Sequence, residues 1–336
     1  MRKIFIFIGL TFFLGCAGKR EHARQNFLLK GNLAFEKGQF EQALHYYNEA
    51  IGVDSTFTTA YYNKALTLVE MDKPYEAIDT YDDLIQIDPK YSRALYNRAN
   101  LYLDVNQYFS ALEDLEALNE VWKDSALLYF TKGLVNTKLK RYNKAIDEFR
   151  HSVELGENNA LALINLGNIY YYTGRYDSAR MFLKRGLELD STLGNGYNTL
   201  GMIDEKEGMY QKAISYFNKA LEIEPKNAWF LNNKGFAYLQ NNQLDSAEYL
   251  INESIKIDPY NAWAYRNKGL LEIEKENYPK AVELLERAYK TDNEIDHLLQ
   301  DLATSYAKIG EIDKACVLLK DVNDAEAMNF KKLNCL

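Results

Sequence analysis

Residues 165–179 read NLGNIYYYTGRYDSA, and two small residues in this stretch, Gly167 and Ala179, decide the fold. Ala179 is one of nine alanines that follow one another at intervals of 34 residues without an insertion. Twelve residues before each alanine stands a glycine or another alanine, so neither column contains a large residue. Two helices can cross closely only where the side chains at the crossing are small. The two columns therefore predict a helical hairpin that is repeated along the chain.

Bulky residues flank the two columns at helical spacing. Four residues before each member of the first column, and four after each member of the second, the side chain is large and apolar, which places it on the same helical face. The first column consists of Gly31, Ala65, Ala99, Gly133, Gly167, Gly201, Gly235, Gly269 and Ala303. The second column consists of Ala43, Ala77, Ala111, Ala145, Ala179, Ala213, Ala247, Ala281 and Ala315.

Short polar segments separate the expected helices. KGQF, TGRY and EGMY have the composition of tight turns between the two helices of one repeat, and Gly174 supplies such a turn. Between repeats, Pro89, Pro225 and Pro259 are expected to end the preceding helix, because proline disfavours helical geometry in the residue before it. Each repeat is thus predicted to be helix, turn, helix.

The 34-residue period and these columns resemble the tetratricopeptide repeat (TPR) over residues 24–325, in nine repeats. The resemblance implies an all-α fold, an α-solenoid of tandem 34-residue helix-turn-helix repeats forming a right-handed superhelix. It also implies that the first helix of each repeat lines the concave wall. Residues 326–336 are left as a C-terminal capping segment. Pro74 and Leu244 depart from the family pattern, which has an aromatic residue before the second helix.

The N-terminus is typical of an export signal. Arg2 and Lys3 precede an apolar run, from Ile4 to Leu14, that is too short to span a bilayer permanently. Gly15 before Cys16 resembles the bacterial lipobox, which implies a signal peptide over residues 1–15, lipidation of Cys16, and an anchor and linker over residues 16–23. The alternative is ordinary secretion with a buried cysteine. The absence of an acidic retention residue after Cys16 favours the outer membrane, facing the periplasm.

Two further cysteines lie near the C-terminus. Cys316 falls in the last repeat and Cys335 in the capping segment. In an exported protein a remaining pair can form a disulfide. The alternative is two isolated thiols that pack as small apolar residues.

The charge balance and the histidines argue against two classes of function. The chain has 48 acidic and 40 basic residues, a net charge of -8, which disfavours nucleic acid as a partner. The four histidines are scattered without the spacing of metal ligands, and no nucleophile motif stands out. We therefore expect no catalysis, no metal site and no cofactor.

Asparagine recurs on the face of the first helices that the family uses for binding. Five of the nine residues two positions before the first column are Asn, and further Asn residues follow the column directly. An amide can hydrogen bond to both sides of an extended peptide backbone, and the TPR resemblance implies that such ladders bind peptides. The alternative is local hydrogen bonding within the fold. The ladder asparagines are Asn63, Asn97, Asn100, Asn165, Asn168, Asn233 and Asn267.

Other candidate binding residues accompany the asparagines. Large aromatic rings anchor many interfaces, and arginine can pair with a carboxylate. The carboxylate clamp of chaperone-type TPR domains is not present in the matching columns, so an acidic C-terminal motif is not the expected ligand. The candidates are Tyr62, Tyr96, Phe130, Trp229, Trp263, Arg93 and Arg266.

These observations predict a non-enzymatic scaffold of the bacterial envelope that binds protein partners. It would hold extended peptide segments in its concave groove while a lipid tethers it to the membrane. The alternative is a glycan- or peptidoglycan-binding accessory protein of cell-wall assembly, which would use the same amides and rings against sugar hydroxyls and faces. An enzyme would need a catalytic domain, and almost no chain lies outside the predicted array.

Overall fold

The computed structural model describes residues 5–156 and 159–335, and their side chains from residue 18 onward. Within these residues it contains 19 helices and no strand, which confirms the predicted all-α repeat fold. The chain divides into two compact units, Met1–Glu157 and Asn158–Leu336, called unit 1 and unit 2 below. Each is described by itself.

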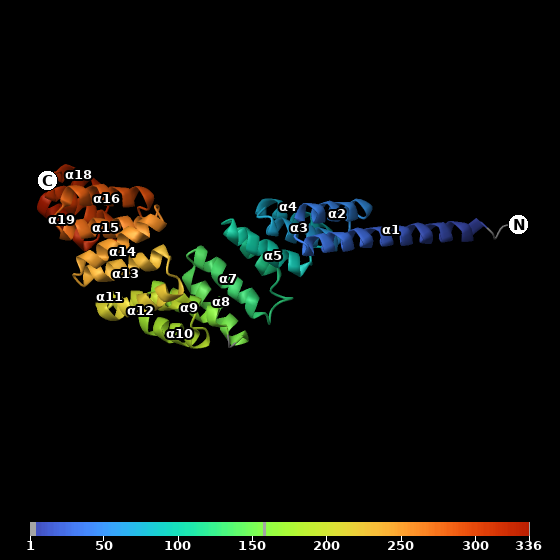
Figure 1. The fold of residues 1–336 in the computed structure, drawn as a ribbon, viewed down its shortest axis with the longest axis horizontal. Helices are drawn as coiled ribbons and strands as arrows, with labels where there is room; N and C mark the ends of the chain where they lie inside the picture. Colours follow the sequence, from blue (N-terminus) through green and yellow to red (C-terminus); the bar gives the residue numbers. More distant parts are fainter. Residues whose placement is uncertain (1–4, 157–158, 336) are drawn as a thin grey trace. The chain divides into compact units, whose positions relative to one another are not determined.

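Unit 1 contains eight helices (Figure 1). They are α1 (Phe5–Glu36), α2 (Phe40–Val53), α3 (Thr58–Glu70), α4 (Pro74–Ile87), α5 (Ser92–Asp104), α6 (Tyr108–Ala117), α7 (Ala126–Lys138) and α8 (Tyr142–Leu155). The backbone of α1 is continuous through the predicted signal, anchor and linker segments, whose first four residues lie outside the described part of the chain.

Unit 2 contains eleven helices. They are α9 (Ala160–Tyr172), α10 (Tyr176–Leu189), α11 (Gly194–Lys206), α12 (Tyr210–Ile223), α13 (Ala228–Gln240), α14 (Leu244–Ile257), α15 (Ala262–Glu274), α16 (Tyr278–Thr291), α17 (Leu298–Lys308), α18 (Ile312–Leu318) and α19 (Ala325–Asn334). As predicted, α4, α12 and α14 end two residues before Pro89, Pro225 and Pro259.

The helices pair as hairpins, from α1 with α2 to α17 with α18, which gives one hairpin for each of the nine predicted repeats. The odd-numbered partner is called the first helix below. Within each unit, the even-numbered helix of a hairpin also contacts the first helix of the next hairpin (Figure 1). The last helix, α19, follows the ninth hairpin and begins one residue before the predicted capping segment.

The two small columns meet where the helices of each hairpin cross. All nine alanines of the second column are fully buried. A Cβ atom added at Gly133 would lie 2.6 Å from Cε1 of Phe149, and one at Gly201 would lie 2.6 Å from Cε1 of Phe217. Phe149 and Phe217 belong to the bulky positions four residues after the alanine column. The small residues therefore admit a large side chain from the second helix into the crossing.

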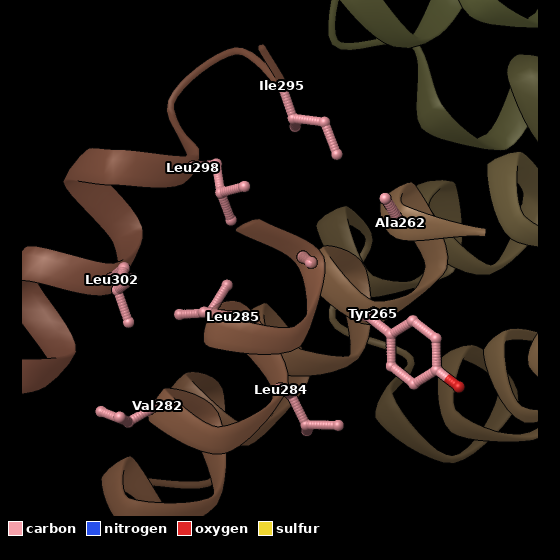
Figure 2. Close-up of a cluster of buried hydrophobic side chains, with 9 residues drawn as sticks. Ala262, Tyr265, Val282, Leu284, Leu285, Ile295, Leu298 and Leu302 are labelled. Carbon is pink, nitrogen blue, oxygen red and sulfur yellow. The ribbon is translucent and has the colours of Figure 1, made fainter. Parts of the chain in front are cut away.

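Consecutive hairpins share their apolar core. Figure 2 shows one such cluster, in which Tyr265 of α15, Leu285 of α16 and Leu302 of α17 are buried together with neighbouring apolar residues. This cluster draws on two repeats, so neither of them buries its apolar face alone.

The turns inside the hairpins repeat as regularly as the helices. One residue in each of the nine turns has a φ angle between 56° and 86°. Four of these residues are glycines, among them Gly174 as predicted. The other five are Asp72, Asn106, Lys140, Asn242 and Glu276, which lie at the same register as the glycines.

Candidate functional site

In unit 1 the ladder asparagines bond to the preceding repeat. The Asn63 amide nitrogen donates to Oδ1 of Asn32 at 2.8 Å. The Asn97 amide nitrogen donates to the hydroxyl oxygens of Tyr62, at 3.1 Å, and Tyr81, at 3.2 Å. Residues predicted to face a ligand therefore join neighbouring first helices in the free protein.

The next step of this ladder uses hydroxyl groups. Tyr96 and Thr131 share a hydrogen bond of 3.1 Å between their side-chain oxygens, and this bond links α5 to α7. The amide of Asn100 donates to the Tyr96 carbonyl oxygen at 2.8 Å, within α5. Asn100 thus serves its own helix.

Unit 2 continues the pattern with shorter side chains. The Thr199 hydroxyl donates to Oδ1 of Asn168 at 2.8 Å, which joins α11 to α9. The Asn233 amide nitrogen donates to Oδ1 of Asn198 at 3.0 Å, which joins α13 to α11. These bonds trace a row of polar contacts across the first helices.

The row ends in one buried amide and one ion pair. The Asn267 amide nitrogen donates to Oδ1 of Asn232 at 3.0 Å, and Asn267 is only 3% exposed. The expectation that Asn267 faces a partner is therefore corrected, because its side chain is enclosed between α13 and α15. Arg266 bonds to Asp301 through Nε at 2.9 Å and Nη2 at 2.8 Å, so an internal carboxylate already neutralises it.

Asn165 differs from the other ladder residues. Its amide donates to the carbonyl oxygen of Leu161 at 2.8 Å, one turn earlier in α9. Both residues are accessible, and Leu161 is 50% exposed. Asn165 therefore presents the rest of its amide to solvent on the ladder face of α9. The ladder face is the face of the first helices that carries the ladder asparagines.

The predicted aromatic anchors separate into two groups. Tyr62, Tyr96 and Phe130 are half-buried, and each packs against a neighbouring ring. Trp263 is also half-buried and packs against the core cluster of α15 to α17. Trp229, in the first turn of α13, is 50% exposed. It is therefore the candidate ring best placed to contact a partner.

Arg93 remains accessible. It is exposed at the start of α5, in contrast to Arg266.

Family models of the tetratricopeptide repeat match along most of this array. Models described as TPR or tetratricopeptide repeat match residues 31–72, 58–91, 80–113 and 206–265. A model described as the tetratricopeptide repeat protein 21 C-terminal ARM domain matches residues 102–234. The chain is a tetratricopeptide repeat protein. Members of this family offer extended surfaces to other proteins and are generally not enzymes.

Two solved structures of other TPR-like solenoids share the fold. The Cut9–Hcn1 hetero-tetramer of APC/C matches with a TM-score of 0.64 and 14% identity, over 92% of this chain and 76% of that chain. PilF of Pseudomonas aeruginosa matches with a TM-score of 0.53 and 18% identity, over 63% and 96%. MamA of Desulfovibrio magneticus RS-1 has a TM-score of 0.49 and 20% identity, over 51% and 97%. A search of curated proteins finds no match.

Two titratable residues on the ladder face of unit 2 in this TPR protein have raised pKa values. Glu205, in α11, has its pKa raised to about 7 by burial, although Lys206 and Arg266 act in the opposite direction. Burial also raises the pKa of Tyr171, in α9, and the negative charges of Glu205 and Asp296 add to this effect. Asp296 lies just before α17, four repeats after Tyr171.

Further ion pairs lie between the helices, where sequence reasoning missed them. Arg98 bonds to Asp114 through Nε at 2.8 Å and Nη2 at 2.6 Å, and to Asp82 through Nη1 at 2.5 Å. In unit 2, Arg180 contacts the fully buried Asp204 at 2.5 Å. A signal was present, because an arginine directly beside the small column is an unusual neighbour for a helix crossing. The contacts of Arg98 with Asp82 and of Arg180 with Asp204 join adjacent repeats, whereas Arg98 and Asp114 join the two helices of one hairpin.

The C-terminal helix is tied to the last hairpin. A disulfide joins Cys316 of α18 to Cys335, with the Cα atoms 5.7 Å apart. Ala327 and Phe330 of α19 pack into a cluster with Leu319. The predicted lipidation site, Cys16, lies in the part of α1 whose side chains are outside the described residues.

The described residues include neither a membrane-spanning helix nor a metal-binding group. No described helix has the length and apolar character required to cross a bilayer. Within the same part of the chain, no three His, Cys, Asp or Glu side chains are grouped so that they could hold a metal ion.

Proposed function

We propose that this TPR protein is a scaffold of the bacterial envelope that holds extended peptide segments of partner proteins against the ladder face of its first helices. The observation that supports the proposal is the polar row that joins α9, α11 and α13 on that face, together with the exposed ring of Trp229, one turn before Asn233 in α13. Extended peptides need backbone partners along their length and at least one apolar anchor. The ladder supplies the first and Trp229 the second.

The internal bonds of the ladder leave hydrogen-bonding capacity for a peptide. A side-chain amide has two N–H groups and an oxygen with two lone pairs. The bond from Asn63 to Asn32 uses one N–H of Asn63, and the bond from Asn233 to Asn198 uses one N–H of Asn233. Asn63 also shares a hydrogen bond with the Tyr47 hydroxyl, whereas the remaining N–H and the oxygen of the half-buried Asn233 amide can meet a peptide backbone. The internal bonds then serve to orient the amides before a partner arrives.

A photo-crosslinking amino acid at position 229 tests this proposal. The matched control places the same amino acid at position 249, because Tyr249 is 66% exposed on the second helix α14. We expect irradiation of intact cells to give protein adducts at position 229 and few at position 249. Adducts that contain muropeptides would support the glycan-binding alternative. Equal protein adducts at both positions would contradict a binding face on the first helices.

The envelope location is a separate part of the proposal and is supported by the sequence alone. The apolar run before Gly15 and Cys16 is the feature that supports lipidation. We propose that acyl chains on Cys16 hold the protein at the outer membrane, with the repeats in the periplasm. Labelling cells with an alkyne-tagged palmitate tests this assignment, because a protein without lipid would incorporate no label at Cys16.

A further inference from the structure

We propose that the ladder face of unit 2 accepts a lysine or arginine side chain of the bound peptide segment, with the Glu205 carboxylate as its partner. This inference rests on the proposed peptide-binding function and names the chemistry of the segment that unit 2 prefers.

The register of the repeats places Glu205 on the ladder face. Glu205 stands four residues after Gly201, and Tyr171 stands four residues after Gly167. The two residues are therefore equivalent in consecutive repeats. Their helices are neighbours on this face, because the hydrogen bond from Thr199 to Asn168 joins α11 to α9.

Glu205 is partly withdrawn from solvent. It is half-buried on the ladder face of α11, and burial raises the pKa of its carboxyl group. Arg266, two repeats further along the chain, also acts electrostatically on Glu205. A bound segment beside this carboxylate would lose part of its own hydration.

The other enclosed acids of unit 2 have cationic partners. Asp301 pairs with Arg266 at 2.8 Å, and Asp204 pairs with Arg180 at 2.5 Å. For Glu205, the described residues provide no side-chain hydrogen bond and no cation within 4.0 Å. Withdrawing an ionised carboxylate from water without a cationic partner costs free energy, which raises the pKa of the Glu205 carboxyl group. A cation from a bound partner would remove this cost.

The surroundings of Glu205 select a cation on a long side chain. Glu205 itself carries the negative charge, and Asp296 acts as a second negative charge on the neighbouring Tyr171, so an anionic side chain of the segment would be repelled. Lysine and arginine can extend several methylene groups toward Glu205 while their backbone stays near the ladder amides. The lone carboxylate is a poor metal site, and the described side chains form no metal-binding group.

Two peptide libraries test this inference with the full-length chain immobilised at pH 8. Both contain nine-residue peptides randomised at every position except the centre, which is lysine in one library and acetyl-lysine in the other. Acetylation removes the charge and keeps the stem. We expect the wild-type protein to retain about fivefold more of the lysine library.

Two substitutions assign the preference to Glu205. Glu205→Gln should retain both libraries alike. The matched control, Glu274→Gln, removes an exposed carboxylate at the end of α15 and should keep the preference. Thermal unfolding of each variant verifies that the array is intact.

The outcomes separate this inference from the proposed function. Equal retention of both libraries by the wild type overturns the inference and leaves peptide binding standing. If neither library is retained, the peptide-binding function fails and the inference fails with it. A lysine preference that survives in Glu205→Gln overturns the role given to Glu205.

Discussion

The ladder faces of the two units follow one register but use different chemistry. In unit 1 the amide of Asn97 reaches the phenolic oxygens of Tyr62 and Tyr81, and these rings also pack on each other. In unit 2 the corresponding links are short, from amide to amide, as between Asn233 and Asn198. Tilted phenolic rings thus take part in the ladder of unit 1, beside the amide link from Asn63 to Asn32, whereas amides and the Thr199 hydroxyl form the links from α9 to α15 in unit 2.

This difference indicates that the two faces have different tasks. Rings that fill a face and bond to its amides stabilise it but leave little for a partner to contact. Unit 2 instead has an exposed tryptophan and an enclosed carboxylate without a partner in the described residues. We therefore expect substitutions on the unit 1 face to change stability and substitutions on the unit 2 face to change binding. The following predictions test this division, from the largest expected effect to the smallest.

The helix crossings of both units should be destabilised equally when a buried alanine is replaced by a large residue. Ala179→Leu in unit 2 and Ala77→Leu in unit 1 each insert a large side chain at a fully buried position. We expect each to destabilise its unit by about 3 kcal/mol or more through overpacking. Hydrogen exchange, which reports the two units separately, measures the loss. A large loss in one unit only would show that the crossings are not equivalent.

The disulfide should stabilise the end of unit 2. Replacing both Cys316 and Cys335 by serine removes a crosslink between residues 19 positions apart. We expect a loss of about 2–3 kcal/mol, confined to α17, α18 and α19, because the crosslink restricts the unfolded chain. Hydrogen exchange localises the effect, and the amides of unit 1 serve as the internal control. Faster exchange in unit 1 would contradict this prediction.

Glu205 should make unit 2 less stable as the pH rises. Its pKa is about 7 in the folded protein, above the ordinary value of 4.5, so between these values the folded state binds more protons than the unfolded state. Stability is therefore lost as the pH increases through this window. We expect Glu205→Gln to be more stable than the wild type by about 2 kcal/mol at pH 8 and equal to it at pH 4.

Urea denaturation of both proteins at the two pH values measures this difference. Glu274→Gln is the control, because Glu274 is exposed. The same gain at pH 4 and pH 8 would mean that the effect has no connection with ionisation of Glu205.

The ladder side chain of Asn97 in unit 1 should contribute to stability, whereas that of Asn165 in unit 2 should contribute little. Asn97→Ala leaves the fully buried Tyr81 without its amide donor, and we expect it to cost about 1 kcal/mol. Asn165→Ala removes one bond to the same helix from an accessible side chain and should cost less than about 0.5 kcal/mol. Denaturation midpoints of the two variants decide the point. Equal losses would remove the distinction between the two faces.

The predicted anchor should leave both units unchanged. We expect Cys16→Ala to release the protein from membranes and to shift its unfolding free energy by less than about 0.5 kcal/mol, because acyl chains supply membrane affinity only. Fractionation of cells and denaturation of the purified variant measure the two effects. Retention of the variant in membranes would contradict lipidation at this residue.

The fold could be read from the sequence because its cause is local and repeated. A small residue at every crossing, such as Gly167 or Ala179, is visible as a column without knowledge of any contact. Pro89, Pro225 and Pro259 likewise predicted the ends of α4, α12 and α14 from local backbone geometry. Turn residues such as Glu276 were missed, because their positive φ angle has no composition signal when glycine is absent.

The candidate site was harder to predict. The ladder columns identified which residues share a face, but not that Asn97 bonds to two tyrosines or that Asn267 is enclosed. These outcomes depend on the distance and tilt between consecutive repeats, which a single repeat does not encode. Glu205 was overlooked for the same reason, since its position in α11 does not by itself show that its carboxylate is withdrawn from water.

Five of the turn residues with positive φ are not glycine, so the stability of the array is below what its backbone would allow. Glu276 and its counterparts adopt a backbone conformation that glycine accepts with less strain, and all five are exposed at bends between helices. Heat resistance can therefore be raised by editing these bends alone, with both binding faces and every helix crossing unchanged. A scaffold of this kind is open to engineering as a hardier framework on which new recognition surfaces are built.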